Sequence, residues 1–283
     1  MSELKIAFLN VGHGDFCYCE TPNSENMIID CGSEKDAVVP SEFLEFKGVS
    51  TINELQISHP HTDHFLDIEE ISKKEIKSFR CPDPNSFENS KIGWKKSDVS
   101  KIKKLKELYR TINPDDKAIS ITNGFGHWLF YPSFDRTDPN TSSIITILSY
   151  KYDKVLMAGD LMKAGWEEML KKPDFLHAIK GTTVLKASHH GRENGFCSTL
   201  FDHISPRICI ISDKSLDKDN ENTSCTDKYS RAIKEGGGGI EFFRMKDGES
   251  VGIRYVLTTR NDNSIFIKIS ASGLYIKTHT NWE

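Results

Sequence analysis

The sequence predicts an α+β fold, in which a single domain spanning all 283 residues is built from two similar half-sheets. Apolar, strand-like runs alternate with helical segments in both halves of the chain, and no low-complexity linker separates the halves. Several of these runs end in an aspartate or lead into histidines. Because such side chains meet only where the strands end at one edge, we expect the sheets to pack with these ends together.

The first half of the chain is predicted to contain four strands and two helices. The strands are expected at residues 5–9, 16–20, 27–32 and 54–58, and the helices at 38–46 and from about residue 65. The tight turn between the first two strands places His13 and Asp15 at one rim of the sheet. Asp30 ends the third strand, and the fourth strand leads directly into the loop 59–64.

That loop carries three histidines and an aspartate within six residues: His59, His61, Asp63 and His64. Imidazole and carboxylate groups together bind divalent ions, and burying four of them without a metal or polar partners would be costly. The order His-x-His-x-Asp-His is also the one that a two-metal site needs. We therefore predict a metal site here; the alternative is a solvated polar loop whose histidines occur by chance.

The middle of the chain, at about 72–117, is predicted to be a lysine-rich insertion in the domain. An amphipathic helix is expected from about residue 100 to 110. Much of its polar surface is lysine, namely Lys101, Lys103, Lys104 and Lys106. These lysines are either a solvated helix face or an electrostatic track for a polyanionic substrate.

The second half of the chain repeats the pattern of strands and helices. Strands are expected at residues 128–132, 144–148, 155–160, 183–187 and 207–211, and helices ending near 172, near 198–203 and at 226–235. The third of these strands ends in Asp160, and the fourth leads into His189 and His190. The tail from 240 to 277 is again strand-like.

Composition narrows the class of protein. Hydrophobic residues make up 37% and charged residues 28%, and no run approaches the roughly 18 apolar residues of a membrane span. The amino terminus lacks the basic and apolar regions of a secretion signal, so we expect a cytoplasmic protein that does not bind membranes. The net charge of −4 argues against a high-affinity nucleic-acid carrier, but not against a metal-dependent enzyme that acts on phosphodiesters.

The cysteines are odd in number and do not show the paired spacing of metal ligands. They stand at positions 17, 19, 31, 81, 197, 209 and 225. Because most of these positions lie in or beside apolar runs, we expect reduced thiols in the core rather than disulfides or ligands.

The ligand-type motifs His59-x-His61-x-Asp63-His64, Gly159-Asp160 and His189-His190-Gly191 resemble those of the metallo-β-lactamase superfamily. Within it, the chain looks most like the hydrolase domain of the bacterial competence protein family ComEC. Further motifs carry that likeness: Phe8-Leu9-Asn10-Val11-Gly12-His13-Gly14-Asp15, Asn140-Thr141-Ser142-Ser143 and Leu185-Lys186-Ala187-Ser188. The resemblance covers about residues 4–260 and implies an αββα sandwich, in which two packed mixed sheets carry helices outside and the site at one edge.

Carried over position by position, the resemblance implies a set of metal ligands. His59 and His61 would bind the first ion, and Asp63 and His64 the second, while Asp160 would bridge the two. These ions would be zinc or manganese.

The resemblance also implies roles around the ligands. One of His189 and His190 would complete the second site, and the other would sit behind it or face the substrate. Asp30 would orient a ligand, because a metal-bound imidazole needs an acceptor on its other nitrogen. Asp15 and His13 would line the rim.

The mechanism implied by this site uses two ions about 3.5–4 Å apart that hold and acidify a water. Asp63 would steer the proton of that water. Lys186, Arg192 and His13 are candidates to hold a phosphate, and the alternative for Lys186 is an ion pair with a buried acid.

The chain departs from its relatives at several positions. The superfamily often has a further histidine ligand, and the candidate is His127, although Tyr131 fits the expected position better. The first metal is therefore expected to be short of a protein ligand, which suits Mn²⁺ better than tightly bound Zn²⁺. The relatives usually have glutamine in place of His13 and a small hydroxyl residue in place of Arg192, which leaves the substrate preference open.

Three functions compete on this basis. The first is a two-metal phosphodiesterase, which the resemblance implies to be a nuclease acting on DNA. The second is a hydrolase of small phosphoesters or cyclic nucleotides, which the acidic pI near 6.2 favours. The third is a non-catalytic subunit or sensor with a protein partner, for instance in an antiviral defence system.

Overall fold

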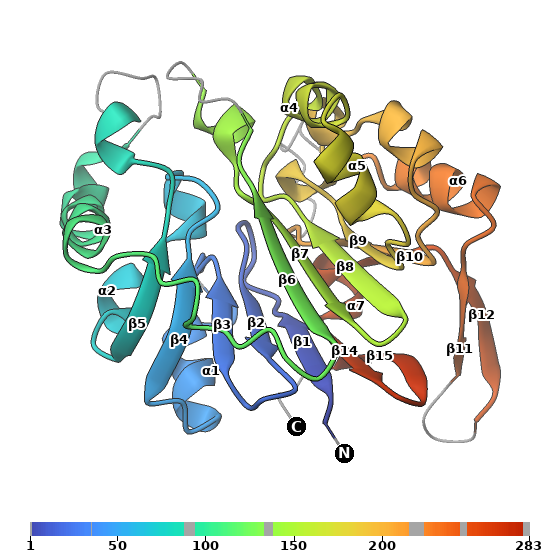
Figure 1. Cartoon of the computed structure of the whole chain (residues 1–283), viewed down its shortest axis with the longest axis horizontal. Coiled ribbons are helices and arrows are strands. Elements are labelled where there is room, and N and C mark those ends of the chain that lie inside the picture. Colours follow the sequence, from blue (N-terminus) through green and yellow to red (C-terminus); the bar gives the residue numbers. More distant parts are fainter. Residues whose placement is uncertain are drawn as a thin grey trace.

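Two large mixed sheets pack face to face, with helices on the outer face of each (Figure 1). This computed structural model describes residues 2–34, 36–87, 94–132, 138–214, 224–243 and 248–279. The arrangement is the predicted αββα sandwich, so the fold prediction is confirmed. It is formed because each sheet buries one face against the other sheet and the opposite face against helices.

The first sheet has seven strands in the order β15-β14-β1-β2-β3-β4-β5. Their bounds are β1 (Leu4–Phe8), β2 (Cys17–Glu20), β3 (Asn26–Ile29), β4 (Thr51–Gln56), β5 (Glu75–Arg80), β14 (Ser264–Ser270) and β15 (Gly273–His279). Strands β3, β4 and β5 run parallel to one another. Asp30 and the loop 59–64, which follow β3 and β4, therefore lie at the same edge of this sheet.

The second sheet has six strands in the order β13-β10-β9-β8-β7-β6. Their bounds are β6 (Phe125–Phe130), β7 (Ile145–Tyr150), β8 (Asp153–Met157), β9 (Val184–Lys186), β10 (Ile208–Ile211) and β13 (Val256–Thr258). Strands β8, β9, β10 and β13 are parallel, so the residues after β8 and β9 also share an edge. A separate hairpin consists of β11 (Ile240–Phe243) and β12 (Ser250–Arg254).

The helices cover the outer faces of both sheets. On the first sheet they are α1 (Pro40–Phe46), α2 (Ile68–Ile71) and α3 (Val99–Thr111); on the second they are α4 (Lys163–Met169), α5 (Pro173–Ile179) and α6 (Thr226–Glu235), and α7 (Thr259–Asp262) joins β13 to β14. In the described part of the chain, no helix has the length and apolar character needed to cross a membrane.

Strand β1 shows how the layers are built. Leu4, Ile6 and Phe8 belong to the core between the sheets, whereas Ala7 belongs to the cluster on the outer, helix-covered side. This alternation follows from the two-residue period of a strand.

All seven cysteines are free and most are buried, as predicted.

Most predicted elements are present with ends shifted by a few residues, and the helix at 226–235 has the predicted bounds. The segment near 198–203 is a 3₁₀ helix, Ser198–Asp202, and the helix expected from residue 65 is only the short α2. Two elements were missed: β5, which lies inside the lysine-rich segment, and α5. The extent of the domain and the insertion at 72–117 stay predictions, and residues 88–93 of that segment lie outside the described residues.

Candidate metal centre

The loops that carry the ligand-type side chains are tied together through their backbones. The amide of Cys31 donates to the carbonyl of His64 at 2.7 Å, and the amide of His189 donates to the carbonyl of Gly159 at 3.0 Å. A Cβ at Gly32 would lie 1.9 Å from the carbonyl oxygen of Asp63, so only glycine permits this approach. The convergence expected at one edge of the sheets is thus present.

Asp30 fixes the loop that follows β4. Its carboxylate accepts hydrogen bonds from the amide of Ser58 at 2.7 Å and from the Ser58 hydroxyl at 2.8 Å. Its Oδ2 atom also lies 2.9 Å from Nδ1 of His64. Asp30 therefore lies in contact with a candidate ligand, and its role in orienting that ligand stays a prediction.

Among the described residues, four side chains form the larger of two clusters of candidate ligands: Asp63, His64, Asp160 and His190 each offer an atom within 4.8 Å of the others. Nε2 of His64 is 3.3 Å from Oδ1 of Asp160. Nε2 of His190 is 3.4 Å from Oδ2 of Asp63 and 3.5 Å from Oδ2 of Asp160. Two imidazoles and two carboxylates are a suitable donor set for a divalent ion.

The hydrogen bonds of the two histidines fit such an ion. Nδ1 of His190 lies 3.1 Å from the carbonyl oxygen of Ser212, which can only accept, so the ring proton is on Nδ1. Nδ1 of His64 likewise faces the carboxylate of Asp30. In both rings the other nitrogen, Nε2, faces the carboxylates of the cluster, and Nε2 of each ring and Oδ1 of Asp160 are buried without a hydrogen-bond partner among the described residues. Because such atoms are costly to bury, the cluster fits a metal ion.

His59 and His61 lie close to each other but have fewer other candidate ligands nearby than His64 and His190. Nε2 of His59 is 3.0 Å from Nδ1 of His61 and 3.9 Å from Oδ2 of Asp160. Among the described residues, neither belongs to a group of three or more close donor atoms. The expectation that the first metal lacks a protein ligand is consistent with this geometry and stays a prediction.

His127 does not approach this pair. It lies on β6, where its Nε2 is 3.8 Å from Oε1 of Glu54, and Glu54 in turn accepts a hydrogen bond of 2.9 Å from Nε of Arg80. Tyr131, the other candidate, also lies beside Arg80. Burial lowers the pKa of His127 to about 4, so this ring is a neutral part of a polar cluster between the sheets.

Lys186 and Asp15 are buried below the site, whereas the sequence suggested Lys186 as a phosphate ligand and Asp15 as a residue of the rim. Lys186 is 4% exposed and Asp15 is 5% exposed, and the ammonium group is hydrogen-bonded to the carboxylate. Burial alone would raise the pKa of Asp15, but the positive charges of Lys186, His190 and His64 together outweigh it and lower that pKa. This is the buried ion pair predicted as the alternative for Lys186, and a group so enclosed cannot hold a phosphate. Asp15 lies beneath the rim rather than on it.

The mouth of the site is lined by His13, Arg192 and His189. Nε2 of His13 is 3.5 Å from Oδ2 of Asp63. The guanidinium of Arg192 reaches Nε2 of His13 at 3.3 Å and Nε2 of His189 at 3.4 Å. His189 faces Arg192 and also lies 3.8 Å from Oδ2 of Asp160, against 3.5 Å for His190. The geometry favours His190 as the ligand, and the choice between the two histidines stays a prediction.

The local backbone at these histidines is unusual. His189 and His190 have φ angles of 49° and 51°, in the left-handed region that side-chain-bearing residues rarely adopt.

Sequence reasoning missed Ser58 and Ser212, which position His64 and His190. A signal existed for both, because Ser58 lies two residues after the end of β4 and Ser212 directly follows β10, and both strands end at the edge of the site.

The fold and this arrangement of histidines and carboxylates define a metal-dependent hydrolase of the αββα class. The sequence model of the metallo-beta-lactamase superfamily matches residues 19–192, and the chain belongs to this superfamily. No curated protein sequence matches the chain.

Solved structures show the same fold at low sequence identity. A mutant of the CmlA beta-hydroxylase matches with a TM-score of 0.51 and 12% identity over 83% of this chain and 51% of that one. CmlA, described as a diiron beta-hydroxylase from Streptomyces venezuelae, matches with a TM-score of 0.50 and 12% identity over 84% and 52%. A diphosphatase from the PhnP family has a TM-score of 0.39 and 12% identity over 74% and 85%. The chain thus spans about half the length of the CmlA structures, and these likenesses concern the fold alone.

Proposed function

We propose that this chain is a metal-dependent phosphodiesterase that cleaves DNA. The observation that carries the proposal is a direct connection between the metal loop and the lysine-rich helix. Nε1 of Trp94 donates a hydrogen bond of 3.0 Å to the carbonyl of Pro60, which lies between His59 and His61. The ammonium of Lys106, on α3, lies over the Trp94 ring at 5.6 Å from its centroid.

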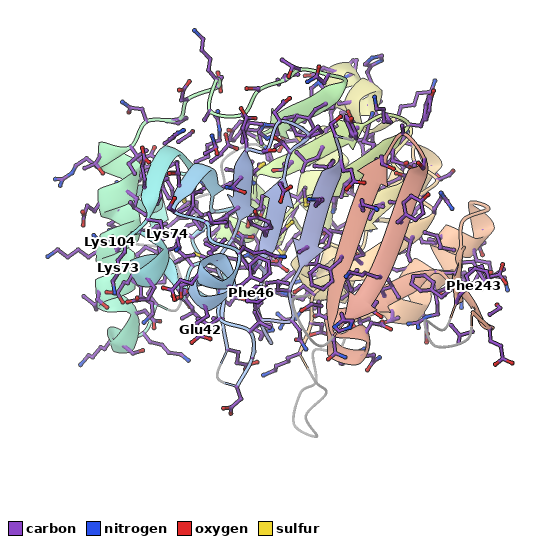
Figure 2. All side chains as sticks on the ribbon, turned by 90° about the horizontal axis from the view of Figure 1, so that it is seen from below. Glu42, Phe46, Lys73, Lys74, Lys104 and Phe243 are labelled. Carbon is purple, nitrogen blue, oxygen red and sulfur yellow. The ribbon has the colours of Figure 1, made fainter. Side chains whose placement is uncertain are left out.

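The charge on this side of the molecule supports a polyanionic substrate. Basic side chains outnumber acidic ones between Trp94 and the end of α3, although the whole chain carries a net charge of −4. Figure 2 shows Lys104 on this side. Lys104 is paired with Glu107 at 2.8 Å, but an exposed pair of this kind contributes little and can exchange its partner for a phosphate.

The chemistry of the site is suited to a phosphodiester. Two divalent ions, zinc or manganese, would supply Lewis acidity and a water of lowered pKa. Asp63 can take the proton of that water because its side chain remains 24% exposed at the mouth. Arg192 can hold a phosphate oxygen, since a guanidinium binds phosphate in a fixed geometry. Hydrolysis forms a bond from the water oxygen to phosphorus, breaks the bond to the leaving oxygen and returns a proton to that oxygen.

The resemblance of the sequence motifs to the ComEC hydrolase domain supports the same substrate. The purified chain should cleave linear double-stranded or single-stranded DNA in the presence of Mn²⁺. Asp63→Ala should abolish the cleavage, and Asp174→Ala, which changes an exposed aspartate of α5, should not. Absence of cleavage by the wild type, or equal cleavage by Asp63→Ala, would overturn the proposal.

The pairing of Arg192 with His13 at the mouth favours one competing function, the hydrolysis of a small phosphoester. A single guanidinium suffices for one phosphate, whereas a polymer needs the additional lysines. Lys103→Glu combined with Lys106→Glu separates the two functions. The double change should lower cleavage of DNA by about tenfold or more at low salt, and it should leave the turnover of a small phosphodiester such as bis(p-nitrophenyl) phosphate unchanged. Turnover of the small ester with no cleavage of DNA would favour the competing function.

A further inference from the structure

Three sulfur atoms meet in the core between the two sheets, below the metal centre. Cys17 and Cys19 lie on β2 and point to the same side of the sheet, because side chains two positions apart in a strand share a face. Met157, the last residue of β8, reaches them from the opposite sheet. Sγ of Cys17 is 3.7 Å from Sγ of Cys19 and 3.8 Å from Sδ of Met157. Cys17 is therefore in contact with two further sulfur atoms.

The three side chains are enclosed and chemically uncommitted. All of them are buried, and both cysteines are free thiols. The thiol of Cys17 donates to Sδ of Met157, and thioether sulfur is only a weak hydrogen-bond acceptor. Strong polar bonds therefore do not account for the meeting of these sulfur atoms.

A small cavity adjoins this sulfur cluster. Its volume is about 20 Å³, which is room for about one water molecule or one ion. Cys17 and Met157 contribute to its wall, together with Asp15, Asp30 and Lys186. The cavity thus offers a space for a single atom beside two of the three sulfur atoms.

The spacing of the sulfur atoms suits a bound metal ion. With metal–sulfur bonds of about 2.3 Å, two sulfur ligands lie about 3.8 Å apart at a tetrahedral angle and about 4.0 Å apart in a trigonal plane. The separations of 3.7 and 3.8 Å from Cys17 are close to these values. Only small movements of the side chains would be needed to admit an ion.

The charges restrict the kind of ion. Lys186 and Asp15 already neutralise each other in a buried ion pair. A divalent ion on one thiolate would leave a net positive charge in the apolar core, whereas a monovalent ion on one thiolate is neutral. Thiolate and thioether ligands select Cu(I) among the common metal ions, whereas imidazole and carboxylate suit the ions of the metal centre above.

We propose that Cys17, Cys19 and Met157 bind one Cu(I) ion. On binding, the thiol of Cys17 releases its proton to solvent and its sulfur bonds to the ion, while Met157 and Cys19 add two further sulfur donors. Nothing is oxidised or reduced. Burial raises the pKa of the Cys17 thiol, so the proton is held until the ion displaces it.

This proposal does not rest on the proposed nuclease activity. The sulfur cluster lies in the core between the sheets, whereas the ligands of the metal centre follow strand ends at one edge. Binding of Cu(I) is measured directly, so the absence of DNA cleavage leaves the proposal standing, and the absence of Cu(I) binding leaves the nuclease standing.

The first test is an anaerobic competition for Cu(I). The full chain, with Zn²⁺ present to fill the metal centre, is titrated against the Cu(I) complex of the chromogenic chelator bathocuproine disulfonate. Each chain should withdraw one Cu(I) ion from the chelator. The affinity should rise by about tenfold per pH unit, because one proton is released for each ion bound. Excess Mn²⁺ should not displace the ion, whereas Ag(I), another soft monovalent ion, should.

Variants of the chain locate the ion. Cys17→Ala, and separately Met157→Leu, which nearly conserves the side-chain volume, should each weaken Cu(I) binding by about tenfold or more. The controls Cys209→Ala and Met169→Leu alter a buried cysteine and a buried methionine outside the sulfur cluster. Both should bind Cu(I) as the wild type does, and thermal unfolding establishes that each variant is folded.

X-ray absorption by the bound copper identifies its ligands. Sulfur neighbours at about 2.3 Å support the proposal. Nitrogen and oxygen neighbours alone would place the ion in the histidine cluster and overturn it, as would equal Cu(I) binding by the wild type and Cys17→Ala. Loss of two thiols in the unfolded, copper-treated chain would show a disulfide of Cys17 with Cys19 in place of a copper site, and would overturn it as well.

Discussion

Oδ2 of Asp30 lies 2.9 Å from Nδ1 of His64, and this contact determines which nitrogen of His64 faces the metal cluster. Asp30 itself is held by two further hydrogen bonds from Ser58. The carboxylate therefore acts on the metal through the imidazole and is a positioning residue.

Asp30→Asn tests this relationship. An asparagine amide can donate as well as accept, so it no longer imposes the Nδ1–H form of His64. Metal affinity, measured by titration calorimetry, should fall by about 10–100-fold while circular dichroism stays that of the wild type. The matched control is Asp153→Asn, at the start of β8 in the second sheet, which is the end of that strand away from Asp160. An unchanged affinity in Asp30→Asn would contradict the role.

The two neighbouring histidines should behave differently. His190→Ala removes a member of the tight cluster and should lower the affinity for the second ion by at least tenfold. His189→Ala removes a ring that faces Arg192 and should change this affinity by less than about threefold. The affinities are compared by competition with a chromogenic chelator, and the reverse order would assign the ligand to His189.

The buried pair of Lys186 and Asp15 predicts a large effect on stability. Lys186→Met leaves the carboxylate of Asp15 buried without a counter-charge, which should lower the free energy of unfolding by about 3–5 kcal/mol. Adding Asp15→Leu should recover most of this loss, because the pair is then replaced by apolar groups. Urea denaturation at neutral pH measures both variants; a stable single variant would show that the pair is not enclosed as described.

His127 predicts a dependence of stability on pH. Its pKa is lowered to about 4 by burial, against an ordinary value of 6.5. The unfolded chain therefore binds a proton at higher pH than the folded chain, so stability is fully present above pH 6.5 and is lost as the pH falls towards 4. The loss amounts to about 3 kcal/mol.

The variant His127→Gln isolates this contribution. The difference in unfolding free energy between pH 7 and pH 4.5 should be smaller in His127→Gln than in the wild type by about 2–3 kcal/mol. His177→Gln, at an exposed position on α5, serves as the control and should retain the wild-type difference. Identical pH profiles for wild type and His127→Gln would contradict the burial of this ring.

The elements that sequence reasoning missed have physical explanations. In the edge strand β5, the apolar residues Ile76 and Phe79 are three positions apart and therefore lie on opposite faces. The strand thus has no two-residue apolar period that the sequence could reveal. Helix α5 begins at Pro173, close to the position where the sequence predicts the preceding helix to end. Proline is tolerated in the first turn of a helix, because the amide that it lacks would have no partner there.

The predictable part of the site was the set of residues at strand ends. Chain order alone placed Asp30, Asp160 and the histidine loop together, because parallel strands end at one edge. The choice between His189 and His190 could not be made from sequence, since it depends on contacts such as that of His190 with the carbonyl of Ser212, which follows the adjacent strand β10. The enclosure of Lys186 likewise depends on a contact with a residue 171 positions away.

The left-handed backbone at His189 and His190 lowers the stability of the fold in order to hold two histidines at the site. A non-glycine residue in this region costs about 1 kcal/mol or more, and the chain carries the cost at two successive positions. Glycine at position 189 would relieve part of that cost. Selection for heat resistance alone should therefore enrich His189→Gly. Selection for metal-dependent turnover should instead retain the histidine at position 190. The two selections should thus act on two neighbouring positions of the same loop.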